Sequence, residues 1–302
     1  MPDLLRVARA VATNQVARLS PRAYLSLTGQ TGRGDALGES PEYIASYFKR
    51  CVDDYLAFAG VPAEQAESWL AGKTIVEYGP GDFPGVALLL LALGARKVYC
   101  VDRFPMVRLS QKNAEVWSAL IASLTPIQLE RARALLRNPQ APSEGFHTES
   151  VQYVVRAHGF SGLQEVCDLA LSRAVLEHVD DLPGTFGDMR AALKPGGVAI
   201  HLVDLKSHGL HQENPLDFLA WPNWLWSLMY SHKGVPNRWR LDRYREIVDA
   251  LGVESVRLEP TQCASASDVL AVRPLLSPPF RDLDDEDLAC LGLWIGFRKP
   301  AA

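Results

Sequence analysis

The sequence has no cysteine pair, no long hydrophobic run and no excess of basic residues. Its five cysteines are scattered and form no CxxC pair, which argues against a disulfide framework or a zinc site and suits free thiols in a reducing cytoplasm. The longest apolar run, residues 86–93, is far shorter than the roughly 20 residues that a membrane helix needs. The N-terminal stretch lacks the continuous apolar core of a signal peptide. We therefore expect a cytoplasmic protein that does not enter a membrane.

The charge balance limits the partners. The formal net charge at pH 7 is −4, whereas a non-specific nucleic-acid binder needs a strongly basic face. A nucleic-acid partner is therefore disfavoured. The chain has 302 residues, of which 48% are hydrophobic and 22% charged, so it can form one sizeable core with an accessory layer.

The first part of the chain, residues 1–72, has an all-helical pattern and is expected to form an N-terminal helical cap. Ser40 is a typical N-cap residue, because Pro41 follows it at the first helical position. A loop rich in Gly, Thr and Ser, residues 26–40, separates two of the helices. The predicted helices span residues 3–19, 41–59 and 62–71.

Strands and helices alternate over residues 73–302. This alternation predicts an α/β fold with a Rossmann-like, doubly wound sheet that is mostly parallel, has one antiparallel strand and binds ligands at the carboxyl ends of its strands. The predicted strands are TIVEYG, KVYCVD, SVQYVV, DLALSR, GVAIHLVDL, ESVRLEP and LWIGFRK. Within this region, helices are predicted over residues 106–123 and 127–137, and insertions near residues 103–148, 208–240 and 260–289.

A glycine-rich turn, YGPGDFPG, follows the first predicted strand. The dinucleotide fingerprint G-x-G-x-x-G is matched by Gly79 and Gly81, but its third position is Pro84. A pyrophosphate prefers backbone amides without competing anions, and this turn carries Glu77 and Asp82. No Lys or Arg lies in the surrounding segment from position 74 to position 95. The charges therefore favour a cationic ligand, such as a nucleoside with an amino-acid tail.

These residues resemble the first motif of the class I S-adenosylmethionine-dependent methyltransferases. Asp102, at the end of the second predicted strand, matches the acid that holds the ribose hydroxyls in that family. The segment CDLALSRAVLEHVDDL is similar to the fourth-strand motif, and LKPGGVAIHLVDL to the approach to the fifth strand. The resemblance implies S-adenosyl-L-methionine as the cofactor. It implies cofactor-binding roles for Glu77, Tyr78, Gly79, Pro80, Gly81, Asp102, Arg103 and Ser172.

The chain departs from the family pattern at two places. Phe83 stands where the family often has a further glycine. Arg156 and Ala157 stand about where an acid commonly contacts the adenine amine. The spacing of Asp102 from the turn fits a dinucleotide as well, so a dinucleotide-dependent oxidoreductase stays as the alternative.

His178, Asp204 and His208 are the candidate catalytic residues. His178 follows the fourth predicted strand in LEHV, and imidazole titrates near neutral pH, as a base for an oxygen or nitrogen nucleophile should. Asp204 and His208 follow the fifth strand, and their spacing of four would place both on one helical face. They could form a base with its orienting carboxylate, or bind a divalent metal together with His211. A metal site usually needs a further carboxylate, and we therefore expect none. Ordinary polar loop contacts are the alternative for all four.

Two further groups of residues lie in the insertion that follows the fifth strand. The aromatic segment PLDFLAWPNWLWSLMY either forms a wall over the acceptor or packs against the sheet. The arginines of VPNRWRLDRYRE either clamp an acidic acceptor or form the solvated side of a helix. Together with LVDLKSHG, these segments are similar to bacterial methyltransferase-domain proteins found with polysaccharide or natural-product biosynthesis.

The sequence therefore predicts a methyltransferase that transfers a methyl group from S-adenosyl-L-methionine to an oxygen or nitrogen of a small-molecule acceptor. Besides the oxidoreductase, one alternative is a protein of the methyltransferase fold that binds the cofactor without methyl transfer.

Overall fold

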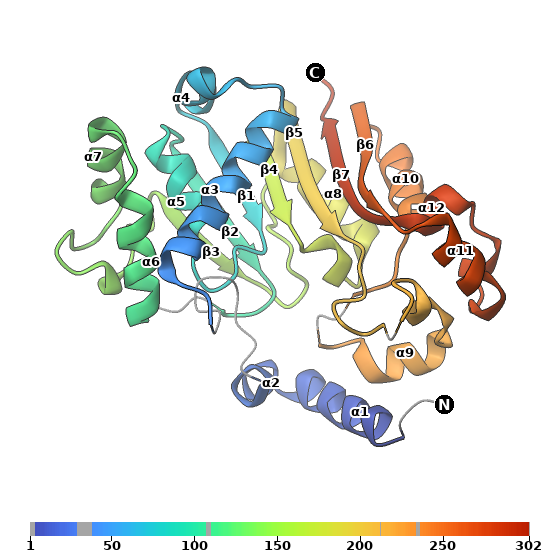
Figure 1. Cartoon of the computed structure of the whole chain (residues 1–302). Helices are drawn as coiled ribbons and strands as arrows, with labels where there is room; N and C mark the ends of the chain where they lie inside the picture. Colours follow the sequence, from blue (N-terminus) through green and yellow to red (C-terminus); the bar gives the residue numbers. More distant parts are fainter. Residues whose placement is uncertain (1–3, 29–37, 107–109, 212, 234–235, 302) are drawn as a thin grey trace. The chain divides into compact units, whose positions relative to one another are not determined.

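A computed structural model of the chain describes residues 4–28, 38–106, 110–211, 213–233 and 236–301 (Figure 1). Most of the loop predicted over residues 26–40 lies outside the described residues. The chain divides into two compact units, which are described one at a time. Unit 1 comprises Met1–Gly29, Arg173–Gly187 and His201–Phe297, and unit 2 comprises Gln30–Ser172, Asp188–Ile200 and Arg298–Ala302.

The strands form one sheet in the order β3-β2-β1-β4-β5-β7-β6. Strand β1 pairs in parallel with β2 and β4, and β2 pairs in parallel with β3. Strand β7 runs antiparallel to β5, because the Leu205 amide donates to the Leu291 carbonyl while the Lys299 amide donates to the Gly197 carbonyl. The predicted fold class is therefore confirmed. The strands are β1 (Thr74–Tyr78), β2 (Lys97–Asp102), β3 (Val151–Val155), β4 (Cys167–Arg173), β5 (Leu193–Asp204), β6 (Glu254–Cys263) and β7 (Cys290–Arg298).

Helices α3, α6, α7 and α11 begin where the sequence supplies a capping residue. The Ser40 hydroxyl accepts a hydrogen bond from the Tyr43 amide, as its place before Pro41 predicts. The α-helices are α1 (Leu4–Leu19), α2 (Pro21–Thr28), α3 (Pro41–Phe58), α4 (Ala66–Leu70), α5 (Gly85–Ala92), α6 (Gln111–Ile121), α7 (Pro126–Ala134), α8 (Leu182–Ala192), α9 (Asn223–Tyr230), α10 (Leu241–Ala250), α11 (Ala266–Val272) and α12 (Asp285–Ala289). Within the described residues, no helix is both long enough and apolar enough to cross a membrane.

Three predicted helices differ in extent from those observed. The helix predicted over residues 106–123 begins only at Gln111, because the Ser110 hydroxyl accepts from the Asn113 amide and caps it there. Thr125 similarly fixes the start of α7, the helix predicted over residues 127–137, through a capping box. The third was predicted over residues 62–71 and is instead a 3-10 turn, η1 (Ala63–Gln65), followed by the short helix α4.

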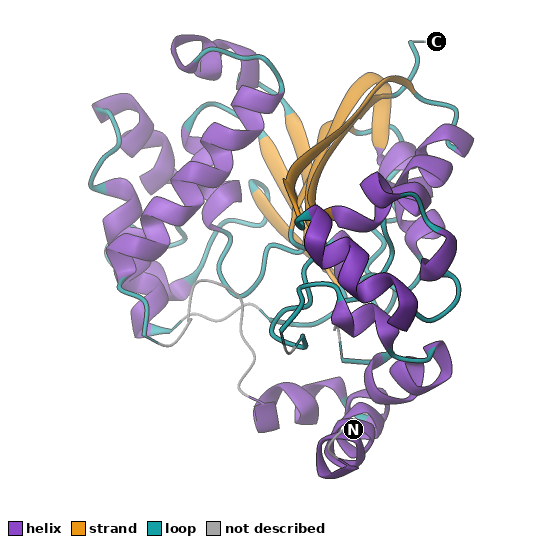
Figure 2. Ribbon diagram, turned by 45° about the vertical axis from the view of Figure 1, so that its right-hand side comes forward, coloured by secondary structure: helices purple, strands orange, loops and turns teal. Residues whose placement is uncertain are grey.

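In unit 2, helices α3, α5 and α6 lie together on one side of strands β1–β3 (Figures 1 and 2). Every residue of α5 is buried. The Phe48 ring of α3 lies against the start of α5, and its centroid is 5.9 Å from that of Phe83. Phe83, which replaces a glycine of the family pattern, is only 3% exposed. Its side chain therefore belongs to the hydrophobic core of unit 2.

In unit 1, helices α1 and α9 are joined by polar contacts. The Asn14 side chain donates to the Leu228 carbonyl at 2.9 Å and accepts from the His232 amide at 2.9 Å. Trp226 of α9 is buried in a hydrophobic cluster with Phe218. For Trp226, packing inside the unit is thus the observed role. Trp224, two residues earlier in the same helix, is 70% exposed.

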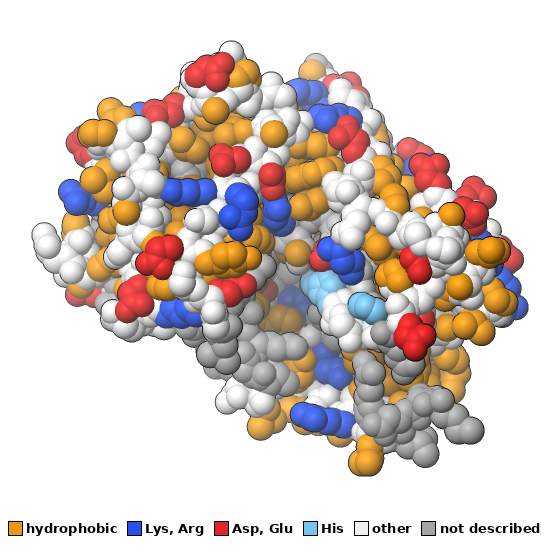
Figure 3. All heavy atoms as spheres, in the orientation of Figure 1, with side chains coloured by type: hydrophobic (Ala, Val, Ile, Leu, Met, Phe, Trp, Pro, Cys, Tyr) orange, Lys and Arg blue, Asp and Glu red, His pale blue; other side chains and the backbone are white. Residues whose placement is uncertain are grey.

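The arginines that follow this helix are held inside unit 1 or paired with acids. Arg238 donates to the Trp221 carbonyl at 2.7 Å, and Arg240, 1% exposed, donates to the Leu205 carbonyl at 2.8 Å. Arg245 makes two hydrogen bonds to the Asp287 carboxylate. Arg238 and Arg240 therefore do not form the solvated side of a helix. On the face that Figure 3 displays, acidic and basic side chains of the described residues are interspersed.

Candidate functional site

The turn after β1 is built on two glycines with left-handed backbone. Gly79 has φ +69° and Gly81 has φ +73°, which glycine adopts without steric cost. The Gly79 amide donates to the Val101 carbonyl of β2 at 2.8 Å. The turn therefore lies against the end of the neighbouring strand before the chain enters α5.

Glu77 is a buried carboxyl group next to this turn. Its residue is 6% exposed, and its Oε2 atom has no hydrogen-bond partner among the described residues. Burial raises the pKa of Glu77 to about 8, and a hydrogen bond with the Ala87 backbone offsets only part of that rise. A buried acid with an unsatisfied oxygen suits a cationic or hydrogen-bond-donating ligand.

Asp102 is the last residue of β2. Its Oδ1 atom accepts from the Phe104 amide at 2.9 Å. Burial raises the pKa of Asp102 to about 6, against the opposing effect of that hydrogen bond. Because β1 and β2 are parallel and Tyr78 lies opposite Val101, the carboxyl ends of the two strands meet at one edge of unit 2.

The other predicted cofactor residues occupy the same edge with different orientations. The Tyr78 hydroxyl donates to Asp188 Oδ2 at 2.7 Å, and burial raises the pKa of this phenol. The Tyr78 side chain therefore points into unit 2. Ser172 is fully buried and lies opposite Tyr78 in β4. Arg103 places its guanidinium 4.8 Å from the centre of the Phe104 ring. Pro80 is buried within the turn.

The segment after β3 approaches Asp102 without supplying an acid there. The Arg156 amide donates to the Asp102 carbonyl at 3.1 Å. A Cβ placed on Gly159, which has φ +68°, would lie 3.7 Å from the Arg103 Cβ. These contacts keep the chain beside the end of β2, at the place where the family pattern has its adenine-contacting acid.

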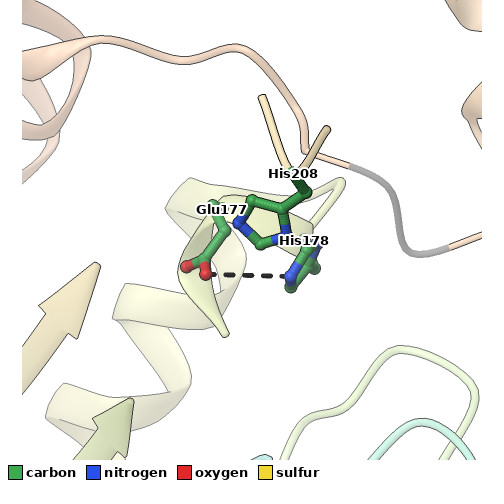
Figure 4. Close-up of side chains that lie close together, drawn as sticks. All are labelled: Glu177, His178 and His208. Atoms are coloured by element: carbon green, nitrogen blue, oxygen red, sulfur yellow. Dashed lines mark ion pairs between the residues drawn. The ribbon is translucent and has the colours of Figure 1, made fainter. Parts of the chain in front are cut away.

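A second group of polar side chains lies in unit 1, where Glu177, His178 and His208 point toward one another (Figure 4). Their ligand atoms all lie within 4.8 Å of one another. His178 Nε2 is 3.7 Å from Glu177 Oε1, and the two imidazole centroids are 4.9 Å apart. Glu177 and His178 come from a 3-10 turn, η3 (Leu176–His178), that follows β4.

Glu177 is the most buried member of this group. Its side chain is 1% exposed, and neither carboxylate oxygen has a hydrogen-bond partner of normal geometry among the described residues. Burial raises the pKa of Glu177 well above its usual range, and the charge of Asp204 adds to the rise. Asn237 fixes the turn, since its amide donates to the Glu177 carbonyl at 2.6 Å and its side chain donates to the Leu176 carbonyl at 2.8 Å.

The prediction that Asp204 and His208 share a helical face is wrong. Asp204 ends β5, and His208 stands in a turn with φ +52°, followed by Gly209 with φ +79°. The turn nevertheless brings His208 Nε2 to 3.8 Å from Asp204 Oδ2. His211 lies outside the group, because its Nδ1 is hydrogen-bonded to the Ser207 hydroxyl.

Glu177 was not among the sequence candidates. Neighbouring residues normally point in different directions on a helix or strand, so the acid beside His178 gave only a weak signal. The 3-10 turn removes that divergence and brings both side chains to His208.

The methyltransferase-domain family matches residues 44–258 of the sequence. The chain belongs to this family, and the resemblance to class I S-adenosylmethionine-dependent methyltransferases is confirmed. Among curated proteins, none matches the chain significantly.

Two solved structures illustrate the similarity to known methyltransferases. One is phosphoethanolamine N-methyltransferase 2 of Haemonchus contortus in complex with S-adenosyl-L-methionine, at 18% identity and a TM-score of 0.41. That match covers 76% of this chain and 49% of the Haemonchus protein, so the chain spans about half the length of that relative. The other is an S-adenosylmethionine-dependent methyltransferase of Mesorhizobium loti, at 20% identity and a TM-score of 0.41, with 76% of this chain and 92% of the relative covered.

Proposed function

We propose that this chain binds S-adenosyl-L-methionine and transfers its methyl group to an oxygen or nitrogen atom of a small-molecule acceptor. The observation that carries the proposal is the edge of unit 2 where the buried acid Glu77 and the strand-ending acid Asp102 follow adjacent parallel strands. The family match supports a methyltransferase over a dinucleotide-dependent oxidoreductase.

The residues of this edge fit the cofactor. The Asp102 carboxylate would accept hydrogen bonds from the ribose hydroxyls, and the backbone of Gly79 and Gly81 would allow the cofactor to approach closely. Glu77, with its unsatisfied Oε2 atom, would stabilise a positive charge on the amino-acid part. When bound, S-adenosyl-L-methionine supplies a methyl group on a sulfonium, which is a good leaving group.

The chain's own contribution to the chemistry is alignment, exclusion of water and removal of a proton from the acceptor. His178 and His208 are the candidate bases, since each presents a partly exposed imidazole, at 27% and 32% exposure. Asp204 would orient His208 through its carboxylate.

We further propose a role in natural-product or polysaccharide biosynthesis in the cytoplasm. The similarity of the LVDLKSHG segment and its neighbours to such proteins supports the role, and the five free thiols support the compartment.

The test measures transfer of labelled methyl from S-adenosyl-L-methionine to pools of small molecules bearing hydroxyl or amino groups. We expect the wild-type chain to label at least one acceptor. His178→Ala and His208→Ala should lower kcat by about 100-fold or more, with little change in cofactor affinity, if the replaced imidazole is the base. Full activity in both variants would show that neither histidine acts as the base. Tight cofactor binding without labelling of any acceptor would instead favour the non-transferring alternative.

A further inference from the structure

We propose that Glu177, His178 and His208 form a binding site for one divalent first-row transition-metal ion. The proposal departs from the expectation from sequence that the chain holds no metal. It depends on this cluster in unit 1 and does not require the methyl transfer proposed above.

The geometry of the cluster is close to that of a metal centre. Two ligands at about 2.1 Å from a tetrahedral ion are roughly 3.4 Å apart. His178 Nε2 and Glu177 Oε1 are 3.7 Å apart, and all three residues offer ligand atoms within 4.8 Å of one another. Small rotations of the side chains would therefore bring the three donors to coordinating distance, and Figure 4 shows them pointing toward a common centre.

The burial of Glu177 is the second, independent observation. The Glu177 carboxyl group is 1% exposed, and neither oxygen has a hydrogen-bond partner of normal geometry among the described residues, although the backbone amides of Glu177 and Asp204 lie near it. Burial of such a group costs free energy on folding. The backbone around it is held by Asn237, so the turn cannot swing outward as a whole without breaking those hydrogen bonds. A cation beside its oxygens would satisfy them and compensate for the burial.

Asp204 lies where it could support the metal ligand His208 without binding the ion itself. Its Oδ2 atom lies 3.8 Å from His208 Nε2, where a carboxylate can orient a ligating imidazole. The same oxygen lies 3.6 Å from Lys206 Nζ, so that the lysine charge beside the site is balanced by an acid. Outer-shell carboxylates of this kind fix the ring orientation and raise the basicity of the ligand.

The donor set selects the class of ion. Two imidazole nitrogens and one carboxylate suit Mn²⁺, Fe²⁺, Co²⁺ or Zn²⁺, whereas Mg²⁺ and Ca²⁺ prefer oxygen ligands throughout. Three protein ligands leave at least one coordination position free. Since His178 and His208 are 27% and 32% exposed while Glu177 is buried, that position faces the side of the histidines, where water or an oxygen-bearing ligand can enter.

A bound ion would change the role of the two histidines. As ligands they are positioning residues that hold the ion, and they no longer have a ring nitrogen available on the metal side to act as a base. The ion itself would then lower the pKa of an oxygen ligand, such as a water molecule or an acceptor hydroxyl.

The test is a titration of the full chain with Co²⁺, after treatment with a chelator and without S-adenosyl-L-methionine. Visible absorption follows Co²⁺, and calorimetric competition with Zn²⁺, Mg²⁺ and Ca²⁺ ranks the ions. We expect one equivalent of Co²⁺ per chain, displaced by Zn²⁺ but not by equal concentrations of Mg²⁺ or Ca²⁺. Glu177→Gln, His178→Ala and His208→Ala should each weaken binding by about 10-fold or more.

His211→Ala is the matched control, because His211 lies in the same loop but outside the cluster. It should bind Co²⁺ as tightly as the wild-type chain. Failure to saturate at one equivalent, or unchanged affinity in the three cluster variants, would overturn the proposal. Equal competition by Mg²⁺ would overturn the assignment to a transition metal. If Glu177→Gln does not fold, as judged by circular dichroism, the partly exposed His178 and His208 variants decide the question. A chain that binds Co²⁺ but transfers no methyl group would leave the metal site standing and reject the proposed function.

Discussion

A carboxyl group buried at the end of a strand lowers the stability of the folded chain once the pH allows it to ionise, and Glu77 is in this position. Its pKa is about 8 in the folded chain, whereas an unperturbed glutamate has a pKa of about 4.5. Between these values the folded chain holds a proton that the unfolded chain has lost. The contribution of Glu77 to stability is therefore fully present below about pH 4.5 and is lost as the pH rises to about 8.

We expect Glu77→Gln to be more stable than the wild-type chain at pH 8–9, by about 2–5 kcal/mol, because an amide does not ionise. The difference should shrink steadily toward pH 5. Urea unfolding at a series of pH values measures it. Glu64→Gln, on an exposed position of η1, is the control and should change little. A difference that stays constant from pH 5 to pH 9 would contradict the burial of an ionisable group at position 77.

Asp102 should give cofactor binding a dependence on pH. Its pKa of about 6 means that the carboxylate form, which accepts hydrogen bonds from ribose hydroxyls, is lost below that pH. We expect the affinity for S-adenosyl-L-methionine to fall as the pH is lowered from 7.5 to 5, by about 10-fold per unit at most. In Asp102→Asn, affinity at pH 7.5 should be weaker by about 10-fold or more, and the part of the pH dependence that is centred near pH 6 should disappear.

Isothermal titration at several pH values measures both effects. Asp53→Asn, at an exposed position of α3, provides the control and should keep the wild-type affinity. An Asp102→Asn variant with wild-type affinity would reject the assignment of Asp102 to the ribose.

At the scale of the elements, the close approach of α3 and α5 in unit 2 depends on a glycine. A Cβ on Gly85, the first residue of α5, would lie 2.2 Å from the Phe48 ring. The ring is packed against Phe83 and has little freedom to move. The absence of a side chain at position 85 therefore sets the distance between the two helices.

Gly85→Ala should lower the free energy of unfolding by about 1–3 kcal/mol, because an added methyl group must displace a packed aromatic ring. Gly187→Ala offers the matched control: it lies inside α8, and a Cβ there would meet nothing within 4 Å. That substitution should leave stability unchanged or raise it by up to about 1 kcal/mol, since alanine is the better helix former. Urea unfolding of both variants compares them. Equal stability of Gly85→Ala and wild type would show that the helices can separate without penalty.

The elements with local signals were predictable from sequence. The alternation of apolar residues located all seven strands to within a few residues, and Ser40 before Pro41 fixed the start of α3. The signal for Glu77 and Asp102 was also local, since each stands at the end of a strand and beside a glycine turn or a chain reversal.

Features set by distant parts of the chain were not predictable. The grouping of Glu177 with His208 depends on Asn237, which is far along the sequence and holds the η3 turn in place. Arg240 has the helical spacing of a solvated residue, yet it is buried because carbonyl groups next to β5 and β7 need a donor there. Sequence spacing contains no information about which carbonyl groups lack partners in the folded chain.

At the scale of the whole molecule, ligand binding and folding are linked. A ligand that binds only the folded chain stabilises it by RT ln(1 + [L]/Kd), which is about 2.7 kcal/mol at 100 times Kd. The net charge of −4 gives an anionic dinucleotide no general electrostatic advantage over S-adenosyl-L-methionine. Thermal stability therefore discriminates between the two cofactor classes by specific binding.

We expect S-adenosyl-L-methionine at 100 times its Kd to raise the midpoint of thermal unfolding by about 2–4 °C, and reduced nicotinamide adenine dinucleotide to leave it unchanged. Differential scanning calorimetry of the wild-type chain measures both, and Asp102→Ala should reduce the first shift. A shift with the dinucleotide and none with S-adenosyl-L-methionine would revive the oxidoreductase alternative.

The unequal exposure of the five thiols has a practical consequence. Cys51, Cys100, Cys167 and Cys290 are buried, and burial raises the pKa of the last three, so that little thiolate forms at neutral pH. Cys263 is exposed at the end of β6, the edge strand of the sheet. A maleimide dye should therefore attach to the native chain at one position, without any engineered cysteine. Such a chain carries its own attachment point for fluorescence or surface immobilisation.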